Sequence, residues 1–442
     1  MAFPHKVILR TLALAAAIFT LAACVNVYHE DFHVSRHSPE LDRSESAQVK
    51  DTPNIRRVFI LFSFGFNNLS YDLKEDIEDI IASGIPEYGF EENVLLVLSQ
   101  NTSKGYNYTT PSAPVLTHIY TRGEEVIRDT LKVYADTTIA ARKAVVQDVL
   151  TIAKDRYPSK SYGMLLSSHG TGWAPQGYCY SPPDKSSGTI FSLDSYYYDG
   201  PAKYHEERPL LKSIGSHYNG SAARSIEIEI PDLAEAIPMH LDYILFDACL
   251  MGGVEVAYEL KDKCRKVGFS QAEVLAEGLD YKTLASHLLE KDIPDVEGVC
   301  DDYFTQYETQ SGVYRSATIS LIDCEKIDPL ASVCKELFAK YREGITSADP
   351  AHVQRFYRYD KHWFYDLESI LIEAGADSAD MGRLHDALDQ CVIYKGHTPE
   401  FMNEFKIKTF SGFSMYLPVY GEEELDMFYK TLKWNEVSGL VI

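Results

Sequence analysis

The sequence predicts an α/β protein with a mainly parallel β-sheet that helices cover on both faces. Continuous apolar runs of strand length, such as RVFILFSF from Arg57 and YILFD at 243–247, alternate with segments of helical spacing. Strands that are buried on both faces are apolar throughout, whereas strands of a half-exposed sheet alternate. The hydrophobic content of 45% and the charged content of 24% indicate an ordinary globular protein.

The elements of this sheet can be placed in chain order. RVFILFSF is followed by the helical segment DLKEDIEDIIA, and NVLLVLS (93–99) forms the second strand. A helix over 141–157 leads to the third strand, YGMLLSS (162–168). YILFD is the fourth strand, and GGVEVAYELKDKC after it is expected to be helical. Sheets of this kind place their chemistry in the loops just past the carboxyl ends of the strands.

The pattern changes after about residue 300. Helical segments dominate there (DPLASVCKELFAKYREGI, DLESILIEAG), with the strand-like SATISLI and GFSMYLP between them. We therefore predict an α/β domain over 54–300 and a mostly helical accessory region with a few strands over 301–442. The irregular stretch from about 174 to 225 is too long for an ordinary connection, which indicates a functional, mobile or cleavable segment.

The N-terminus has the features of a targeting signal. Lys6 and Arg10 precede the short apolar run TLALAAAIFTLAA, which ends in Leu-Ala-Ala-Cys24 and resembles a bacterial lipobox. We predict a lipoprotein signal peptide over 1–23, lipid attachment at Cys24 and a polar tether over 24–53. The alternative is a plain secretory signal. This prediction places the mature protein in the bacterial cell envelope, lipid-anchored on the outer membrane or the periplasmic face.

The net charge bears on the binding partners of the protein, and the cysteine content bears on its thiol and metal chemistry. The net charge of −23 repels phosphate backbones, so a nucleic-acid partner is not expected. Of the eight cysteines, seven remain when Cys24 is set aside, and an odd number outside the cytoplasm indicates a free thiol. There is no C-x-x-C pair, which excludes a zinc knuckle or a thioredoxin motif.

Two predicted strand ends carry residues suited to nucleophilic chemistry. In MLLSSHGTGW the predicted strand is followed by His169-Gly170. In ILFDACLMGG the predicted strand leads into Asp247-Ala-Cys249. An imidazole next to a cysteine can stabilise its thiolate at neutral pH. The amides of Gly170 and Cys249 are candidates for an oxyanion hole. The alternatives are a structural histidine and a buried, inert cysteine.

SSHGTGW and FDACLMGGVEVAYEL resemble the two signature blocks of the clostripain family of cysteine peptidases, in the clan of caspases, gingipains and legumain. FSQAEVLAEGLDY (269–281) and SGFSMYLP (411–418) extend the resemblance. It implies a caspase-like α/β/α sandwich with a C-terminal extension, His169 as general acid/base and Cys249 as nucleophile. It also implies cleavage after Arg or Lys, with Asp247 receiving the basic side chain. A carboxylate can bind guanidinium through two parallel hydrogen bonds, which favours Arg over Lys; alternatively, Asp247 orients a loop amide.

The resemblance has further implications for processing and metals. Family members are often cleaved between the histidine and the cysteine, where this chain has basic residues that are candidates for self-cleavage. These residues are Lys185, Lys203, Arg208, Lys212 and Arg224. Some members depend on calcium, and acidic side chains here could supply oxygen ligands, but no D-x-D-x-D-G loop is present. We therefore expect no metal and no cofactor, and calcium is the alternative that the resemblance leaves open. One departure is Asn67-Asn68 after the first strand, where relatives often have Asp-Asn.

The predicted function is that of a lipid-anchored, monomeric cysteine endopeptidase that cleaves proteins or peptides after basic residues. One alternative is an inactive caspase-like protein of the envelope that binds cationic peptides or glycans, since a fold does not guarantee a function. The other is a peptidase of the same clan that cleaves after Asn or Asp.

Overall fold

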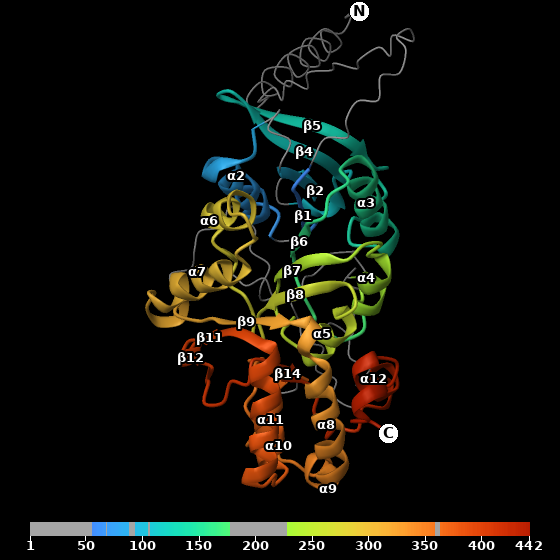
Figure 1. Ribbon diagram of the computed structural model, residues 1–442, viewed down its shortest axis with the longest axis vertical. Helices are drawn as coiled ribbons and strands as arrows, with labels where there is room; N and C mark the ends of the chain where they lie inside the picture. The colour runs from blue at the N-terminus through green and yellow to red at the C-terminus, as the bar shows by residue number, and fades with distance from the viewer. Residues whose placement is uncertain (1–54, 68, 88–92, 105–106, 177–227, 359–362) are drawn as a thin grey trace, which may run out of the picture. The chain divides into compact units, whose positions relative to one another are not determined.

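A computed structural model describes residues 55–67, 69–87, 93–104, 107–176, 228–358 and 363–442. In this part of the chain a 10-stranded sheet has the order β11-β9-β8-β7-β6-β1-β2-β4-β5, with β3 paired to β2 (Figure 1). Its strands are β1 (Arg57–Gly65), β2 (Asn93–Lys104), β3 (Asn107–Pro111), β4 (Val115–Arg122), β5 (Glu125–Val133), β6 (Tyr162–Ser167), β7 (Leu241–Asp247), β8 (Cys264–Phe269), β9 (Thr318–Asp323) and β11 (Val392–His397).

The centre of the sheet is parallel. β1 pairs with β2 and β6, β6 with β7, and β7 with β8, all in parallel register. β1 and β6 are buried along their whole length, as their continuous apolar sequences predict. The neighbours β6 and β7 pack so closely that a Cβ at Gly163 would lie 2.0 Å from the Tyr243 ring. This contact requires glycine at that position of β6.

Helices cover both faces of the sheet. Figure 1 shows α2, α6 and α7 on one face and α3, α4 and α5 on the other, so the predicted α/β/α sandwich is confirmed. The helices that begin before residue 301 are α2 (Asp72–Gly84), α3 (Lys143–Arg156), α4 (Ile230–Ala236), α5 (Val254–Leu260), α6 (Tyr281–Ala285), η2 (Ser286–Glu290) and α7 (Val296–Glu308) in the described part of the chain. The helix predicted after the fourth strand is shorter than expected, because Cys264 already begins β8, which pairs with β7.

The edges of the sheet are antiparallel. β4 and β5 form a hairpin on β2 that the sequence analysis did not identify. At the opposite edge, β9 and β11 come from the region after residue 300 and extend the same sheet from β8. The predicted accessory region therefore contributes strands to the sheet that carries the candidate site.

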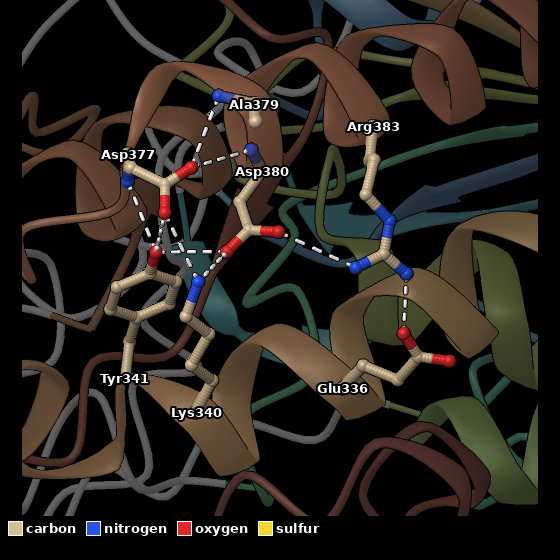
Figure 2. Close-up of polar contacts among 7 residues, drawn as sticks. All are labelled: Glu336, Lys340, Tyr341, Asp377, Ala379, Asp380 and Arg383. Atoms are coloured by element: carbon tan, nitrogen blue, oxygen red, sulfur yellow. Dashed lines mark hydrogen bonds and ion pairs between the residues drawn. The ribbon is translucent and has the colours of Figure 1, made fainter.

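The rest of the C-terminal region is mainly helical. Its elements are η3 (Gly312–Tyr314), η4 (Cys324–Lys326), α8 (Asp328–Lys340), α9 (Arg342–Thr346), β10 (Tyr365–Asp366), α10 (Leu367–Glu373), α11 (Ser378–Cys391), β12 (Glu400–Phe401), β13 (Phe405–Lys406), β14 (Ser414–Met415), α12 (Glu423–Tyr429) and α13 (Lys433–Ser438). Figure 2 shows the polar network that joins α8 to α11, in which Lys340 and Tyr341 bond Asp377 and Asp380. β14 pairs with β10, and Ser414 also forms a bridge with Gly253 near the start of α5.

Candidate active site

The two predicted strand ends meet at one edge of the sheet. β6 and β7 are adjacent and parallel, with Ser167 in register with Asp247. His169 and Cys249 each follow this pair by two positions, so both leave the sheet at the carboxyl ends of neighbouring strands. We call residues 168–174 the His169 loop and residues 248–253 the Cys249 turn.

The backbones of the His169 loop and the Cys249 turn touch. A Cβ at Gly170 would lie 2.5 Å from the Cys249 carbonyl oxygen and 3.0 Å from Cβ of Ala248. A Cβ at Gly172 would lie 2.5 Å from the carbonyl oxygen of Leu250. Only residues without a side chain allow this approach, so the sequence His-Gly-Thr-Gly lets the half-buried His169 lie beside the Cys249 turn.

The Cys249 turn is held by a second segment, residues 270–276, which follows β8. The Leu250 amide donates to the Ala272 carbonyl at 2.9 Å, and the Gly252 amide donates to the Ser270 carbonyl at 2.7 Å. Leu250 has a φ of 62°, a left-handed conformation that costs a non-glycine residue about 1–2 kcal/mol. These backbone hydrogen bonds compensate for that strain and fix the direction in which the chain leaves β7.

The sulfur of Cys249 is in contact with the same 270–276 segment. The Val274 amide donates to Sγ at 3.0 Å, and Sγ lies 3.7 Å from the Val274 carbonyl oxygen. The thiol side chain is buried. Because an N–H donor stabilises a thiolate more than a thiol, the backbone at Val274 is suited to hold the anionic form.

Asp247 ends β7 below the Cys249 turn and is also buried. Its Oδ2 accepts hydrogen bonds from Ser167 Oγ at 2.9 Å and from the Tyr281 hydroxyl at 2.6 Å. Burial, together with the negative charge of Asp247, raises the pKa of Tyr281 well above its ordinary value, so Tyr281 remains a donor. Asp247 is therefore the acceptor at the centre of a polar group formed by β6, β7 and α6.

Two buried carboxyl groups near the Cys249 turn were not predicted from the sequence. Glu255, in the first turn of α5, accepts hydrogen bonds from the Tyr416 amide at 2.9 Å and the Tyr429 hydroxyl at 2.8 Å. Glu273, beside Val274, forms an ion pair with Arg358 of the C-terminal region. The sequence signal was weak: each is an acid within an otherwise apolar stretch.

The His169 loop is tied to the same C-terminal residues. The Trp173 ring lies 4.9 Å from the rings of both Tyr416 and Tyr429, between centroids. Aromatic pairs at this spacing are favourable beyond the area that they bury. The loop with His169, the helix with Glu255 and the C-terminal segments therefore share one packed cluster.

Several sequence predictions lie outside the described residues. These are the lipidation site Cys24 and the candidate cleavage residues Lys185, Lys203, Arg208, Lys212 and Arg224. Within the described residues, no group of three or more His, Cys, Asp or Glu side chains is arranged to hold a metal ion. In the same ranges, no helix is both long enough and apolar enough to cross a membrane.

Comparisons with known proteins give the class of the chain. Residues 217–436 match the model of the clostripain family of peptidases. The fold matches the inactive zymogen of a C11 protease from Parabacteroides distasonis, with a TM-score of 0.67, 25% identity, and coverage of 88% of this chain and 99% of the other. It also matches a secreted C11 cysteine protease from Bacteroides thetaiotaomicron, with a TM-score of 0.67, 24% identity, and coverage of 88% and 100%. A comparison with curated proteins found no match.

These findings make the protein a cysteine peptidase with an α/β fold. Its match to the clostripain family model covers residues 217–436, which include Cys249. The family resemblance, the fold class and the enzyme class predicted from the sequence are therefore confirmed.

Proposed function

We propose that the protein is an endopeptidase in which Cys249 is the nucleophile and His169 the general acid/base. The observation that carries this proposal is the contact between Gly170 and the Cys249 backbone, which brings the two loops together. The Val274 amide at the sulfur adds a donor for the thiolate.

In the proposed reaction, the Cys249 thiolate attacks the scissile carbonyl carbon, and the carbonyl oxygen becomes an oxyanion. The Gly170 and Cys249 amides would donate to that oxygen. The C–N bond then breaks, protonated His169 gives its proton to the leaving amine, and a thioester remains. Water, deprotonated by His169, attacks the thioester and releases the acid and the thiol.

We propose that Asp247 selects a basic side chain in the substrate, Arg in preference to Lys. Its carboxylate lies at the carboxyl end of β7, two positions before the nucleophile, and is already fixed by Ser167 and Tyr281. A fixed carboxylate can bind guanidinium through two hydrogen bonds, whereas an ammonium group interacts as a point charge. The selector would thus be rigid before substrate arrives.

Fluorogenic peptides ending in Arg, Lys, Asn or Asp test this proposal, assayed with and without limited trypsin treatment. We expect cleavage after Arg, weaker cleavage after Lys, and none with Cys249→Ala or His169→Ala. Asp247→Asn should lower kcat/KM for Arg substrates by about 100-fold or more, because it removes the charge that pairs with guanidinium. Cleavage after Asn or Asp, or full activity in Cys249→Ala, would contradict the proposal.

Gly170→Ala tests the contact on which the proposal depends. The new methyl group would meet a backbone carbonyl that cannot move aside without displacing Cys249, so we expect a loss of kcat of about 100-fold or more. Gly382→Ala is the matched control, because nothing lies within 4 Å of the added carbon in α11. Equal activity of both variants would show that the contact is irrelevant to catalysis.

We also propose that the protein is secreted and is anchored by lipid at Cys24. It is monomeric and independent of metals in this proposal. It also cleaves itself between His169 and Cys249. A related protease is described as a zymogen and another as secreted, which supports processing and export. Mass spectrometry of the purified protein beside Cys249→Ala tests self-cleavage, and identical intact masses would argue against it. Cys24→Ala should abolish incorporation of labelled palmitate, and removal of metals by EGTA should leave activity unchanged.

A further inference from the structure

A buried ion pair lies next to the backbone group that contacts the sulfur of Cys249. Glu273 has a side chain with 0% exposure, and that of Arg358 is 12% exposed. The guanidinium Nε lies 3.1 Å from Oε2 and 3.2 Å from Oε1 of the carboxylate. Buried charges cost desolvation energy, and removing one partner leaves the other uncompensated, so the pair strongly constrains both segments.

The ion pair completes the attachment of the 270–276 segment at the point where it meets the thiol. The Ala272 amide donates to Thr318 Oγ1 of β9 at 2.9 Å, and the Ala272 carbonyl accepts from Leu250. The next residue is Glu273, and the one after it is Val274, whose amide lies 3.0 Å from Sγ. The orientation of the Val274 peptide unit therefore depends on where Glu273 is held.

Arg358 belongs to a C-terminal segment that also contacts the histidine side of the site. Phe364, six positions further on, lies against the His169 loop, because a Cβ at Gly172 would be 2.8 Å from its ring. The Tyr357 and Phe364 rings pack edge to face at 6.3 Å between centroids. Arg358 thus contacts the 270–276 segment, and Phe364, which packs on Tyr357, contacts the His169 loop.

We propose that the Glu273–Arg358 ion pair is a positioning device for the peptidase reaction, which holds the Val274 amide against the sulfur of Cys249. This inference rests on the proposed role of Cys249 as nucleophile. The role proposed for both charged residues is one of positioning. Their effect is exerted through the Val274 N–H, which favours the thiolate over the thiol. Without the ion pair the segment relaxes, the donor leaves the sulfur, and the thiolate forms only at higher pH.

The test is the pH dependence of Cys249 alkylation by iodoacetamide, followed by peptide mass spectrometry. We expect Arg358→Met to shift the midpoint of the rate profile upward by about one pH unit, which slows alkylation near pH 6.5 by about tenfold. Rates at pH 9 should converge with those of the wild type. Arg358→Lys keeps the charge but not the fork of donors, so it should lie between the two. Arg383→Met, which removes an exposed ion pair in α11, should leave the profile unchanged.

The double variant Glu273→Gln/Arg358→Met serves if Arg358→Met fails to fold, because it removes both charges of the ion pair. Circular dichroism verifies its fold, and we expect its profile to show the same upward shift. Profiles of the double variant and of Arg358→Lys that coincide with the wild type would overturn the inference. Alkylation is measured at Cys249 whether or not peptides are cleaved. A failure of the proposed function, seen as cleavage by Cys249→Ala, is therefore a separate outcome.

Discussion

At the scale of single residues, Glu255 joins parts of the chain that are distant in sequence. Burial raises the pKa of its carboxyl from 4.5 to about 7, and the hydrogen bonds from the Tyr416 amide and the Tyr429 hydroxyl oppose the shift. The folded protein therefore keeps this carboxyl protonated at pH values where the unfolded chain has already ionised it. Stability is then linked to pH through this one side chain.

The raised pKa of Glu255 makes the folded protein less stable as pH rises. The contribution of Glu255 is neutral below about pH 4.5, becomes unfavourable as pH rises towards 7, and then levels off, with a total loss on the order of 3 kcal/mol. We expect Glu255→Gln to be more stable than the wild type at pH 8 by up to this amount, with a much smaller difference at pH 4.5. Urea unfolding at both pH values measures it. The exposed Glu424→Gln should show no pH-dependent difference, and a pH-independent effect of Glu255→Gln would contradict the assignment.

At the scale of elements, the strands that were predicted correctly are those marked by a continuous local run of apolar residues. Apolar runs located β1, β2, β6 and β7, because strands buried on both faces cannot alternate. The β4–β5 hairpin was missed, since β5 is an edge strand with mostly exposed side chains and no continuous apolar run. Helix α5 was predicted too long, because the pairing of Cys264 in β8 depends on β7 and not on local sequence.

The arrangement of the candidate site follows from the same strand pattern. His169-Gly170 and Cys249 were identified because each follows a predicted strand of one sheet. The sequence did not show that β7 ends at Asp247 or that Leu250 turns with positive φ, which places Cys249 in a turn after the strand. The Glu273–Arg358 pair could not be predicted, since its residues lie 85 positions apart and only the folded C-terminal region brings them together.

The α8–α11 pair makes a prediction at the same scale. Asp377 caps α11 by accepting from the Ala379 and Asp380 amides at 3.1 and 3.0 Å, and it also receives Lys340 from α8 at 3.1 Å (Figure 2). Asp377→Ala removes both interactions and should lower Tm by a few degrees, about 2–4 °C. Asp377→Asn retains a capping oxygen and should lower Tm less. Thermal unfolding by circular dichroism measures both, and equal Tm values for Asp377→Ala and the wild type would contradict the prediction.

At the scale of the whole molecule, the C-terminal region is part of the structure that supports the site. β9 and β11 extend the main sheet, and Ser414 forms a bridge with Gly253 of the Cys249 turn. Trp173 of the His169 loop packs on Tyr416 and Tyr429. The site therefore depends on contacts that cross the predicted boundary at residue 300.

A chain truncated after Phe410 should not assemble the site. It lacks Tyr416, Tyr429 and Trp434, and each buried aromatic ring lost from a core typically costs about 3–5 kcal/mol. This sum exceeds the net stability of an ordinary domain. We expect rapid alkylation of all cysteines and no cooperative thermal transition by circular dichroism. Removal of the exposed Ile442 alone should have no effect, and a folded, active truncation would refute the dependence.

The bridge between Gly253 and Ser414 also sets the time at which the site can form. Translation proceeds from the N-terminus, so Cys249 leaves the ribosome well before Ser414, Tyr416 and Tyr429. Until these residues arrive, Glu255 lacks the donors from Tyr416 and Tyr429, and the Cys249 turn lacks its bridge partner. A nascent chain or a prematurely terminated fragment can therefore contain His169 and Cys249 and still lack part of the structure that supports the candidate site.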